Sequence, residues 1–222
     1  MIRLRLLLLC LTFAGFNKSF AQSRLQQWDD KIMIDLSERR TEEKTGILLF
    51  LSNTYRYGDV GIPAGLLIGG LVSNDRQMRE NALYVASSTA ISYGLTELLK
   101  LIVKRPRPYM QNIRIVPVYR AMGTSFPSGH TSSTIATATA LSMAYPKWYV
   151  IAPSFAFASA TAYSRMYRGA HYPSDVLCGI VVGSGSAYLT HKLQKVMFNK
   201  RSDRRARALA LAQAQENQYG ID

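Results

Sequence analysis

The stretch SRMYRGAHYPSD, residues 164–175, is the most informative part of this chain. It places Arg165, His171 and Asp175 at fixed offsets, and an apolar run lies on each side of it. An arginine can bind an anion bidentately, and an imidazole beside a carboxylate can attack or move a proton. We therefore expect a polar connection between two helices that takes part in chemistry.

Two further stretches carry matching residues. KLIVKRPRP, residues 100–108, is rich in cations, and FPSGHT, residues 126–131, adds a second imidazole, His130. Together the three stretches supply a cationic pocket with two imidazoles and one carboxylate. Such a set of groups is suited to handling a phosphate.

The fixed positions of these stretches resemble the three motifs of the type-2 phosphatidic acid phosphatase superfamily. They are Lys100, Arg107 and Pro108; Pro127 to His130; and Ser164, Arg165, His171 and Asp175. The motifs occur in order without a departure at any fixed position, and the resemblance covers about residues 25–195. The family also contains soluble bacterial acid phosphatases and vanadium haloperoxidases.

Composition narrows the class of protein. A net charge of +13 and a pI near 9.9 suggest nucleic-acid binding at first sight. The apolar residues, 48% of the chain, lie in long blocks, and this fits a membrane protein with basic flanks better. We expect a membrane and a lipid phosphate as partners, and no nucleic acid.

Residues 1–21 have the layout of a signal peptide. Arg3 and Arg5 precede an uncharged apolar run, and small residues stand before a possible cut after Ala21. The alternative is a retained first transmembrane helix. Cleavage would remove Cys10 and leave Cys178 as a single thiol without an internal disulfide.

Residues 22–45 predict an amphipathic helix. Leu25, Trp28, Ile32 and Leu36 recur at helical spacing among charges, so we expect the helix to lie at the membrane interface. The alternative is a helix packed on a soluble core.

Residues 46–195 predict an all-α transmembrane bundle of five to six spans. The apolar segments are residues 47–73, 82–103, 131–145, 148–163 and 176–189. Small residues at four-residue spacing in the first and last segments predict close helix packing; they are Gly61, Gly65 and Gly69, and Gly179, Gly183 and Ala187.

The basic tail, residues 196–222, predicts a cytoplasmic end by the positive-inside rule. Counting spans back from it places the loop 104–130 and the loop 164–175 on the same outer face. We therefore expect a bacterial inner-membrane protein whose site faces the periplasm.

Several residues are expected to bind phosphate. Lys100, Arg107 and Arg165 supply positive charge, and Glu97 can pair with Lys100 one turn away. Ser128 and Gly129 stand at a predicted helix start, where free N–H groups favour an anion.

The family resemblance implies the catalytic roles. His171 would be the nucleophile, Asp175 would accept a hydrogen bond from its ring, and His130 would be the general acid and then the base. The residues alone do not choose which histidine attacks. No metal and no cofactor are expected.

The sequence thus predicts an integral membrane lipid phosphatase with a phosphohistidine intermediate. The resemblance suggests phosphatidylglycerophosphate, undecaprenyl pyrophosphate, phosphatidic acid or lipid A as substrate. The expected headgroup contacts are Tyr109, Arg114, Tyr119 and Arg120. The alternatives are a soluble periplasmic acid phosphatase, a non-catalytic phospholipid-binding membrane protein and, less favoured in so short a chain, a vanadate-dependent peroxidase.

Overall fold

The computed structural model describes the backbone of residues 20–219 and the side chains of residues 24–196. This part of the chain is all-helical and contains no strand. The helices are α2 (Phe20–Glu38), α3 (Glu42–Val72), α4 (Arg76–Val103), α5 (Pro108–Gln111), α6 (Gly129–Ala144), α7 (Trp148–Tyr167) and α8 (Pro173–Tyr219). The predicted signal peptide lies almost wholly outside the described residues.

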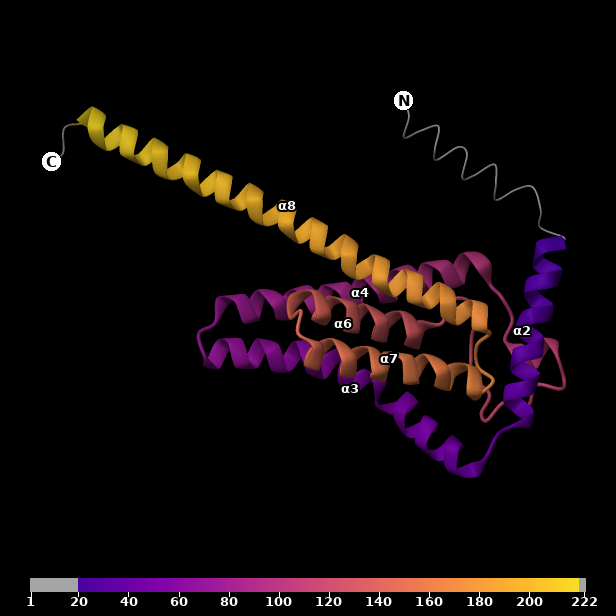
Figure 1. The fold of residues 1–222 in the computed structure, drawn as a ribbon. Helices are drawn as coiled ribbons and strands as arrows, with labels where there is room; N and C mark the ends of the chain where they lie inside the picture. Colours follow the sequence, from indigo (N-terminus) through magenta and orange to yellow (C-terminus); the bar gives the residue numbers. More distant parts are fainter. Residues whose placement is uncertain (1–19, 220–222) are drawn as a thin grey trace.

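Helix α6 is the centre of the bundle. It contacts α3, α4, α7 and α8, and α8 runs far beyond the bundle (Figure 1). Nearly every residue of α6 from Thr131 to Ala140 is buried, and most of them are Ser, Thr or Ala. Such small side chains let four neighbouring helices approach one central helix closely.

Local sequence accounts for the start of α3 and for both ends of α4. The Thr41 side chain accepts a hydrogen bond from the Lys44 N–H at the start of α3, and Asp75 does the same for Met78 at the start of α4. Helix α4 ends at Lys104, whose φ of 49° is left-handed, two residues before Pro106.

Helix α3 is one continuous helix from Glu42 to Val72. It runs through residues 55–59, and Figure 1 shows a bend along it. Pro63 lies inside this helix and cannot donate the usual backbone hydrogen bond. The polar residues in this region therefore lie on a helix and not in a loop.

The two predicted glycine stripes have different outcomes. A Cβ on Gly183 would lie 2.4 Å from the Ser132 carbonyl oxygen, and one on Gly179 would lie 2.9 Å from that of Ser128. These contacts confirm the close packing of α8 on α6. The prediction was wrong for Gly61 and Gly65, because a Cβ there would meet nothing within 4 Å.

Within residues 20–219, no helix combines the length and the apolar character by which a membrane span is assigned, so the five to six expected spans are not found there.

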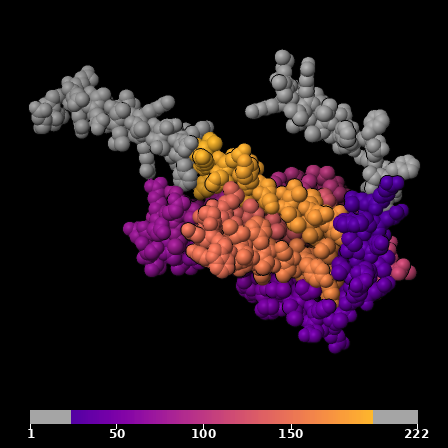
Figure 2. All heavy atoms as spheres, viewed as in Figure 1, coloured from indigo at the N-terminus to yellow at the C-terminus, as the bar shows by residue number. Residues whose placement is uncertain are grey.

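Helix α2 crosses one end of the bundle and contacts α7 and α8 (Figures 1 and 2). Its fully buried side chains are Asp29 and Met33, whereas Leu25 and Trp28 are 48% and 45% exposed. The buried residues Asp29 and Met33 therefore each come one position after a residue of the predicted apolar stripe, Trp28 and Ile32. Met33 packs against Ile115 and Tyr172, which tie α2 to the loops at this end.

Candidate active site

The three motif stretches meet at the end of the bundle that α2 covers. Backbone hydrogen bonds join their loops: the Ser125 N–H donates to the Arg105 carbonyl, and the Ser128 N–H donates to the Asp175 carbonyl. A third bond runs from the Val118 N–H to the Arg168 carbonyl. The structure thus brings together the loops that the sequence placed on one face.

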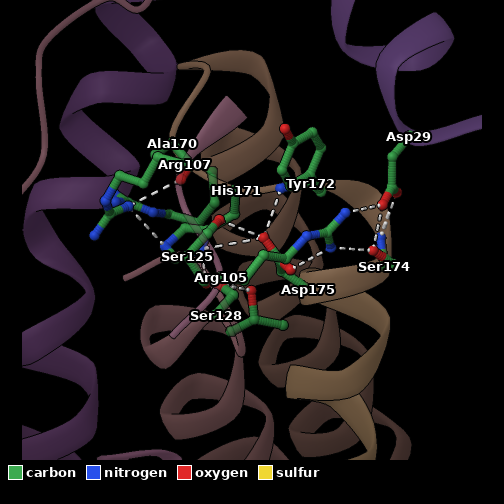
Figure 3. Close-up of polar contacts among 12 residues, drawn as sticks. Asp29, Arg105, Arg107, Ser125, Ser128, Ala170, His171, Tyr172, Ser174 and Asp175 are labelled. Carbon is green, nitrogen blue, oxygen red and sulfur yellow. Dashed lines mark hydrogen bonds and ion pairs between the residues drawn. The ribbon is translucent and has the colours of Figure 1, made fainter. Parts of the chain in front are cut away.

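His171 has a defined tautomer. Its side chain is 3% exposed, and Nδ1 lies 2.6 Å from the Ser125 carbonyl oxygen (Figure 3). A carbonyl can only accept, so Nδ1 carries the proton. Nε2 is then unprotonated, and it lies 3.4 Å from Nη1 of Arg107. This is the arrangement that a nucleophilic imidazole requires.

Asp175 does not make the expected hydrogen bond to His171, because its Oδ2 lies 3.9 Å from Nδ1. The fully buried carboxylate accepts instead from the Ser125 hydroxyl, from the Tyr172 N–H at 2.9 Å and from Arg105 at 2.8 Å. Burial raises the pKa of Asp175, and Arg105 opposes this shift. Asp175 is therefore linked to His171 through Ser125, whose hydroxyl contacts the carboxylate and whose carbonyl contacts the ring.

His130 lies in the first turn of α6, and its ring packs on Tyr55 with ring centroids 3.9 Å apart. Burial, followed by the charges of Arg165 and Arg168, lowers the pKa of His130 to about 2. Burial and the charge of Arg165 also hold the pKa of His171 well below its ordinary value. With both imidazoles neutral and the surrounding arginines charged, the site has an excess of positive charge.

The three predicted cations are held in different ways. Arg107 donates to the carbonyls of Gly123, Ala170 and Met122. Arg165 is 2% exposed, donates to the Ser52 hydroxyl and the Tyr119 phenol oxygen, and keeps Nε without a partner. Lys100 makes the predicted ion pair with Glu97 at 2.7 Å.

Ser128 and Gly129 begin α6 as predicted. Ser128 is the N-cap residue, but its hydroxyl pairs with the Thr131 hydroxyl at 2.9 Å and makes no capping bond. The first N–H groups of α6 are therefore not satisfied by this side chain. A Cβ on Gly129 would lie 3.5 Å from the Lys100 Nζ, so this backbone and the ammonium group are neighbours. Both features suit an anion.

Arg168 is a candidate site residue that the sequence reasoning missed. It is 4% exposed, its guanidinium carbon lies 4.1 Å from the Tyr119 ring centroid, and its Nε and Nη1 have no partner among the residues that the structure describes. Burial, followed by the nearby Arg165, lowers its pKa to about 10. Buried guanidinium donors without a partner are costly unless an anion binds them. The sequence feature that could have identified Arg168 is its position within the third motif, between Arg165 and His171.

Asp29 and Arg105 were also missed. Arg105 bridges Asp29 at 2.7 Å and Asp175 at 2.8 Å, and its guanidinium carbon lies 4.0 Å from the Tyr172 ring centroid (Figure 3). Arg105 was predicted only as part of a basic loop. Asp29 lies in a helix that was predicted from its apolar residues, so no signal pointed to it.

The expected headgroup residues do not form one cluster of free side chains. The hydroxyl of Tyr109 donates to the Ala121 carbonyl, that of Tyr119 accepts from Arg165, and Arg114 pairs with Glu38. Arg120 is exposed beside a hollow that Tyr109 also lines. Their role in headgroup binding remains a prediction.

A groove of about 820 Å³ leads away from the site between α3 and α4. Its polar end is lined by Lys100, Gly129 and His130. The lining also includes the charged residues Arg56, Asp59 and Glu97. Most of the other lining side chains are apolar or small, among them Val60, Ala64, Leu67, Leu83, Ala86 and Ala90. From Lys100 to Leu83 along α4 is about 25 Å at 1.5 Å per residue.

Two curated proteins are similar to this chain in sequence. The undecaprenyl-diphosphatase of Sulfolobus acidocaldarius is 30% identical over 67% of this chain and 70% of its own length. The undecaprenyl-diphosphatase BcrC of Bacillus subtilis is 29% identical over 53% of this chain and 60% of its own length. The matches thus span about 60 to 70% of these two curated relatives.

A solved structure shares the fold. It is the transmembrane PAP2 type phosphatidylglycerolphosphate phosphatase from Bacillus subtilis, with a TM-score of 0.65, 21% identity, and coverage of 87% of this chain and 95% of that one. The family model of the PAP2 superfamily matches residues 81–198, which include all three motifs. The chain therefore belongs to the PAP2 superfamily.

Proposed function

We propose that this chain is a membrane lipid phosphatase that hydrolyses a phosphomonoester or diphosphate through a phosphohistidine intermediate. One observation carries the proposal: the unprotonated Nε2 of His171 lies 3.4 Å from Nη1 of the buried Arg107, and the buried Arg165 and Arg168 of the same motif as His171 keep donors that find no partner among the described residues. A neutral nucleophile beside unpaired cations is suited to attack on a bound phosphate.

The proposed first step joins His171 to phosphorus. The Nε2 lone pair attacks the phosphorus atom, the ester or anhydride P–O bond breaks, and the leaving oxygen takes a proton from His130. His130 must be protonated for this step, and the negative charge of the bound phosphate raises its pKa by opposing the effect of the neighbouring cations. The cations stabilise the charge that spreads over the equatorial oxygens.

In the second step water attacks the phosphohistidine. His130, now neutral, takes a proton from the water, the P–N bond breaks, and phosphate is released. Asp175 and Ser125 keep the ring of His171 in one orientation throughout, because the Ser125 carbonyl retains the proton on Nδ1. No step in this scheme calls for a metal ion.

The groove between α3 and α4 supports a lipid substrate over a small soluble ester. Its mainly apolar walls begin at His130 and Lys100, so a chain lying in it would present its phosphate to the site. The two curated relatives act on undecaprenyl diphosphate by their names, and a polyprenyl diphosphate is therefore the first substrate to test.

A membrane location with the site facing the periplasm belongs to the same proposal. Large apolar side chains lie on the outside of the bundle, whereas its interior at α6 holds Ser, Thr and Ala. Val72, Leu101, Trp148 and Val181 are each at least 69% exposed. Large apolar residues outside and small residues inside are typical of helices packed in lipid.

The test is phosphate release by detergent-purified protein, with His171→Ala as the matched control. The panel contains a polyprenyl diphosphate, phosphatidylglycerophosphate, phosphatidic acid, lipid A and a soluble aryl phosphate. Release from a lipid that His171→Ala abolishes is the expected result. Release from the soluble ester alone would instead favour a periplasmic acid phosphatase, and no release from any substrate by folded protein would refute the proposal.

A further inference from the structure

Asp29 lies outside the three motifs and outside the matched region, residues 81–198, yet it reaches the site. It is fully buried in α2. Its carboxylate accepts hydrogen bonds from the Ser174 N–H at 3.0 Å and from the Ser174 hydroxyl, and it pairs with Arg105 at 2.7 Å (Figure 3). A buried carboxylate with this many partners is a built contact.

Arg105 divides its donors between two fully buried carboxylates. Its Nη2 contacts Asp29 at 2.7 Å and the Gln26 amide oxygen at 2.7 Å. Its Nη1 contacts Asp175 at 2.8 Å and the Ser174 hydroxyl at 2.7 Å. Asp29 thus fixes one side of the guanidinium group while the other side contacts the third motif.

The contacts continue from Asp175 to the proposed nucleophile. The Ser125 hydroxyl donates to Asp175, and the Ser125 carbonyl accepts the Nδ1 proton of His171. Without the charge of Asp29, Arg105 would keep its ion pair with Asp175 but lose the attraction on its other side. The guanidinium group would then shift toward Asp175 and disturb the contact of Asp175 with Ser125. Small displacements of a catalytic group lower rates strongly.

We propose that Asp29 is a positioning residue for His171 and acts through Arg105, Asp175 and Ser125. The inference rests on the proposed phosphatase function. It makes α2 a working part of the active site and not only a cover on the end of the bundle.

The test compares Asp29→Asn with Asp35→Asn. Asn keeps the size of Asp29 and an oxygen for the Ser174 N–H, but it removes the charge on Arg105. Asp35 lies on the same helix, is half exposed and pairs with Arg39. We expect Asp29→Asn to lower kcat about 10- to 100-fold with an unchanged KM. Asp35→Asn should stay within about twofold of the wild type.

A double-mutant cycle tests whether the effect of Asp29 on kcat passes through Arg105. If Asp29 acts through Arg105, adding Asp29→Asn to Arg105→Gln should lower kcat no further. Independent, multiplicative losses would overturn the inference, and so would a wild-type kcat in folded Asp29→Asn. Asp29→Ser is the second variant if Asp29→Asn does not fold, because it also removes the charge and leaves room for water.

Histidine ring ¹⁵N chemical shifts provide a readout that does not depend on activity. The signal of His171, assigned with His171→Ala, should change in Asp29→Asn and remain unchanged in Asp35→Asn. An inactive wild type would refute the proposed function, and the ring shifts would still decide this inference. Identical His171 shifts in wild type and Asp29→Asn would overturn it.

Discussion

The Ser125 carbonyl sets the tautomer of His171, and Asp175 acts one contact further away. The Ser125 carbonyl holds the proton of the neutral ring on Nδ1, and burial with the charge of Arg165 holds the pKa of His171 well below its ordinary value, so Nε2 keeps its lone pair. Near the two histidines, the buried Arg165 and Arg168 retain donors that have no partner within the described part of the chain. At the scale of single residues, the site is therefore suited to binding an anion.

Arg168→Gln tests whether that guanidinium group binds the phosphate. We expect kcat/KM for a soluble aryl phosphate to fall about 10- to 100-fold, because a hydrogen bond to a charged group contributes about 1.5–3 kcal/mol. Arg76→Gln is the control, since Arg76 is exposed and pairs with Glu80. An unchanged kcat/KM in folded Arg168→Gln would exclude Arg168 from phosphate binding.

The pKa of His130 predicts a loss of stability in acid. The unfolded chain takes up a proton near pH 6.5, whereas the folded site resists protonation down to about pH 2. The contribution of His130 to the free energy of unfolding is therefore fully present above pH 6.5. Below that pH it falls by up to about 1.4 kcal/mol per pH unit.

Thermal unfolding between pH 7.5 and 4.5 checks this in wild type and His130→Gln. The variant should lose less stability on acidification. Asp175, whose raised pKa acts in the opposite direction, is common to both proteins and cancels in the comparison. Parallel pH profiles would contradict the buried, neutral state of His130.

At the scale of elements, the contact of α8 with α6 holds the second and third motifs together. Ser128 and Asp175 stand at the starts of these two helices and are joined by a backbone hydrogen bond. Gly179 and Gly183 permit the close approach, because a side chain at either position would meet the backbone of α6. The spacing of the two helices therefore fixes the spacing of the motifs.

Gly183→Ala should destabilise the protein, because its Cβ would lie 2.4 Å from the Ser132 carbonyl oxygen. We expect a loss of about 1–3 kcal/mol, as for other overpacked cores. Gly185→Ala is the matched control on the same helix, where a Cβ meets nothing within 4 Å. It should be neutral or stabilising by up to about 1 kcal/mol. Equal unfolding temperatures for the two variants would contradict the packing described here.

At the scale of the whole molecule, the site and the groove form one continuous feature. His130, Gly129 and Lys100 line both the phosphate site and the polar end of the groove. A lipid lying between α3 and α4 would meet the cations with its headgroup and the apolar walls with its chain.

Ala90→Phe tests this arrangement by filling the groove away from the cations. The variant should lose about tenfold or more in kcat/KM for a lipid substrate, since a large side chain would displace the buried chain. It should keep its activity on a short soluble phosphate ester. Ala152→Phe, an exposed substitution on α7, is the control. Equal losses on both substrates would argue against the groove as the lipid site.

Much of the fold and of the site could be predicted from short-range patterns. Ser128 was predicted at a helix start and stands there, and the spacing of the motif residues predicts a phosphate site. The apolar segments placed the motif loops on one face, where the structure has them. The bend in α3 and the open surroundings of Gly61 could not be predicted, because they depend on which neighbours a helix meets.

The helical class, the residues within each motif and the ion pair of Lys100 with Glu97 can be predicted from the sequence alone, since each depends on groups close together in the chain. The contact of Ser125 with His171 and the bridge of Arg105 between Asp29 and Asp175 depend on tertiary packing. Those partners lie 46 to 76 residues apart. Their contacts follow from how α2, α6 and α8 pack, and no local periodicity or spacing encodes that packing.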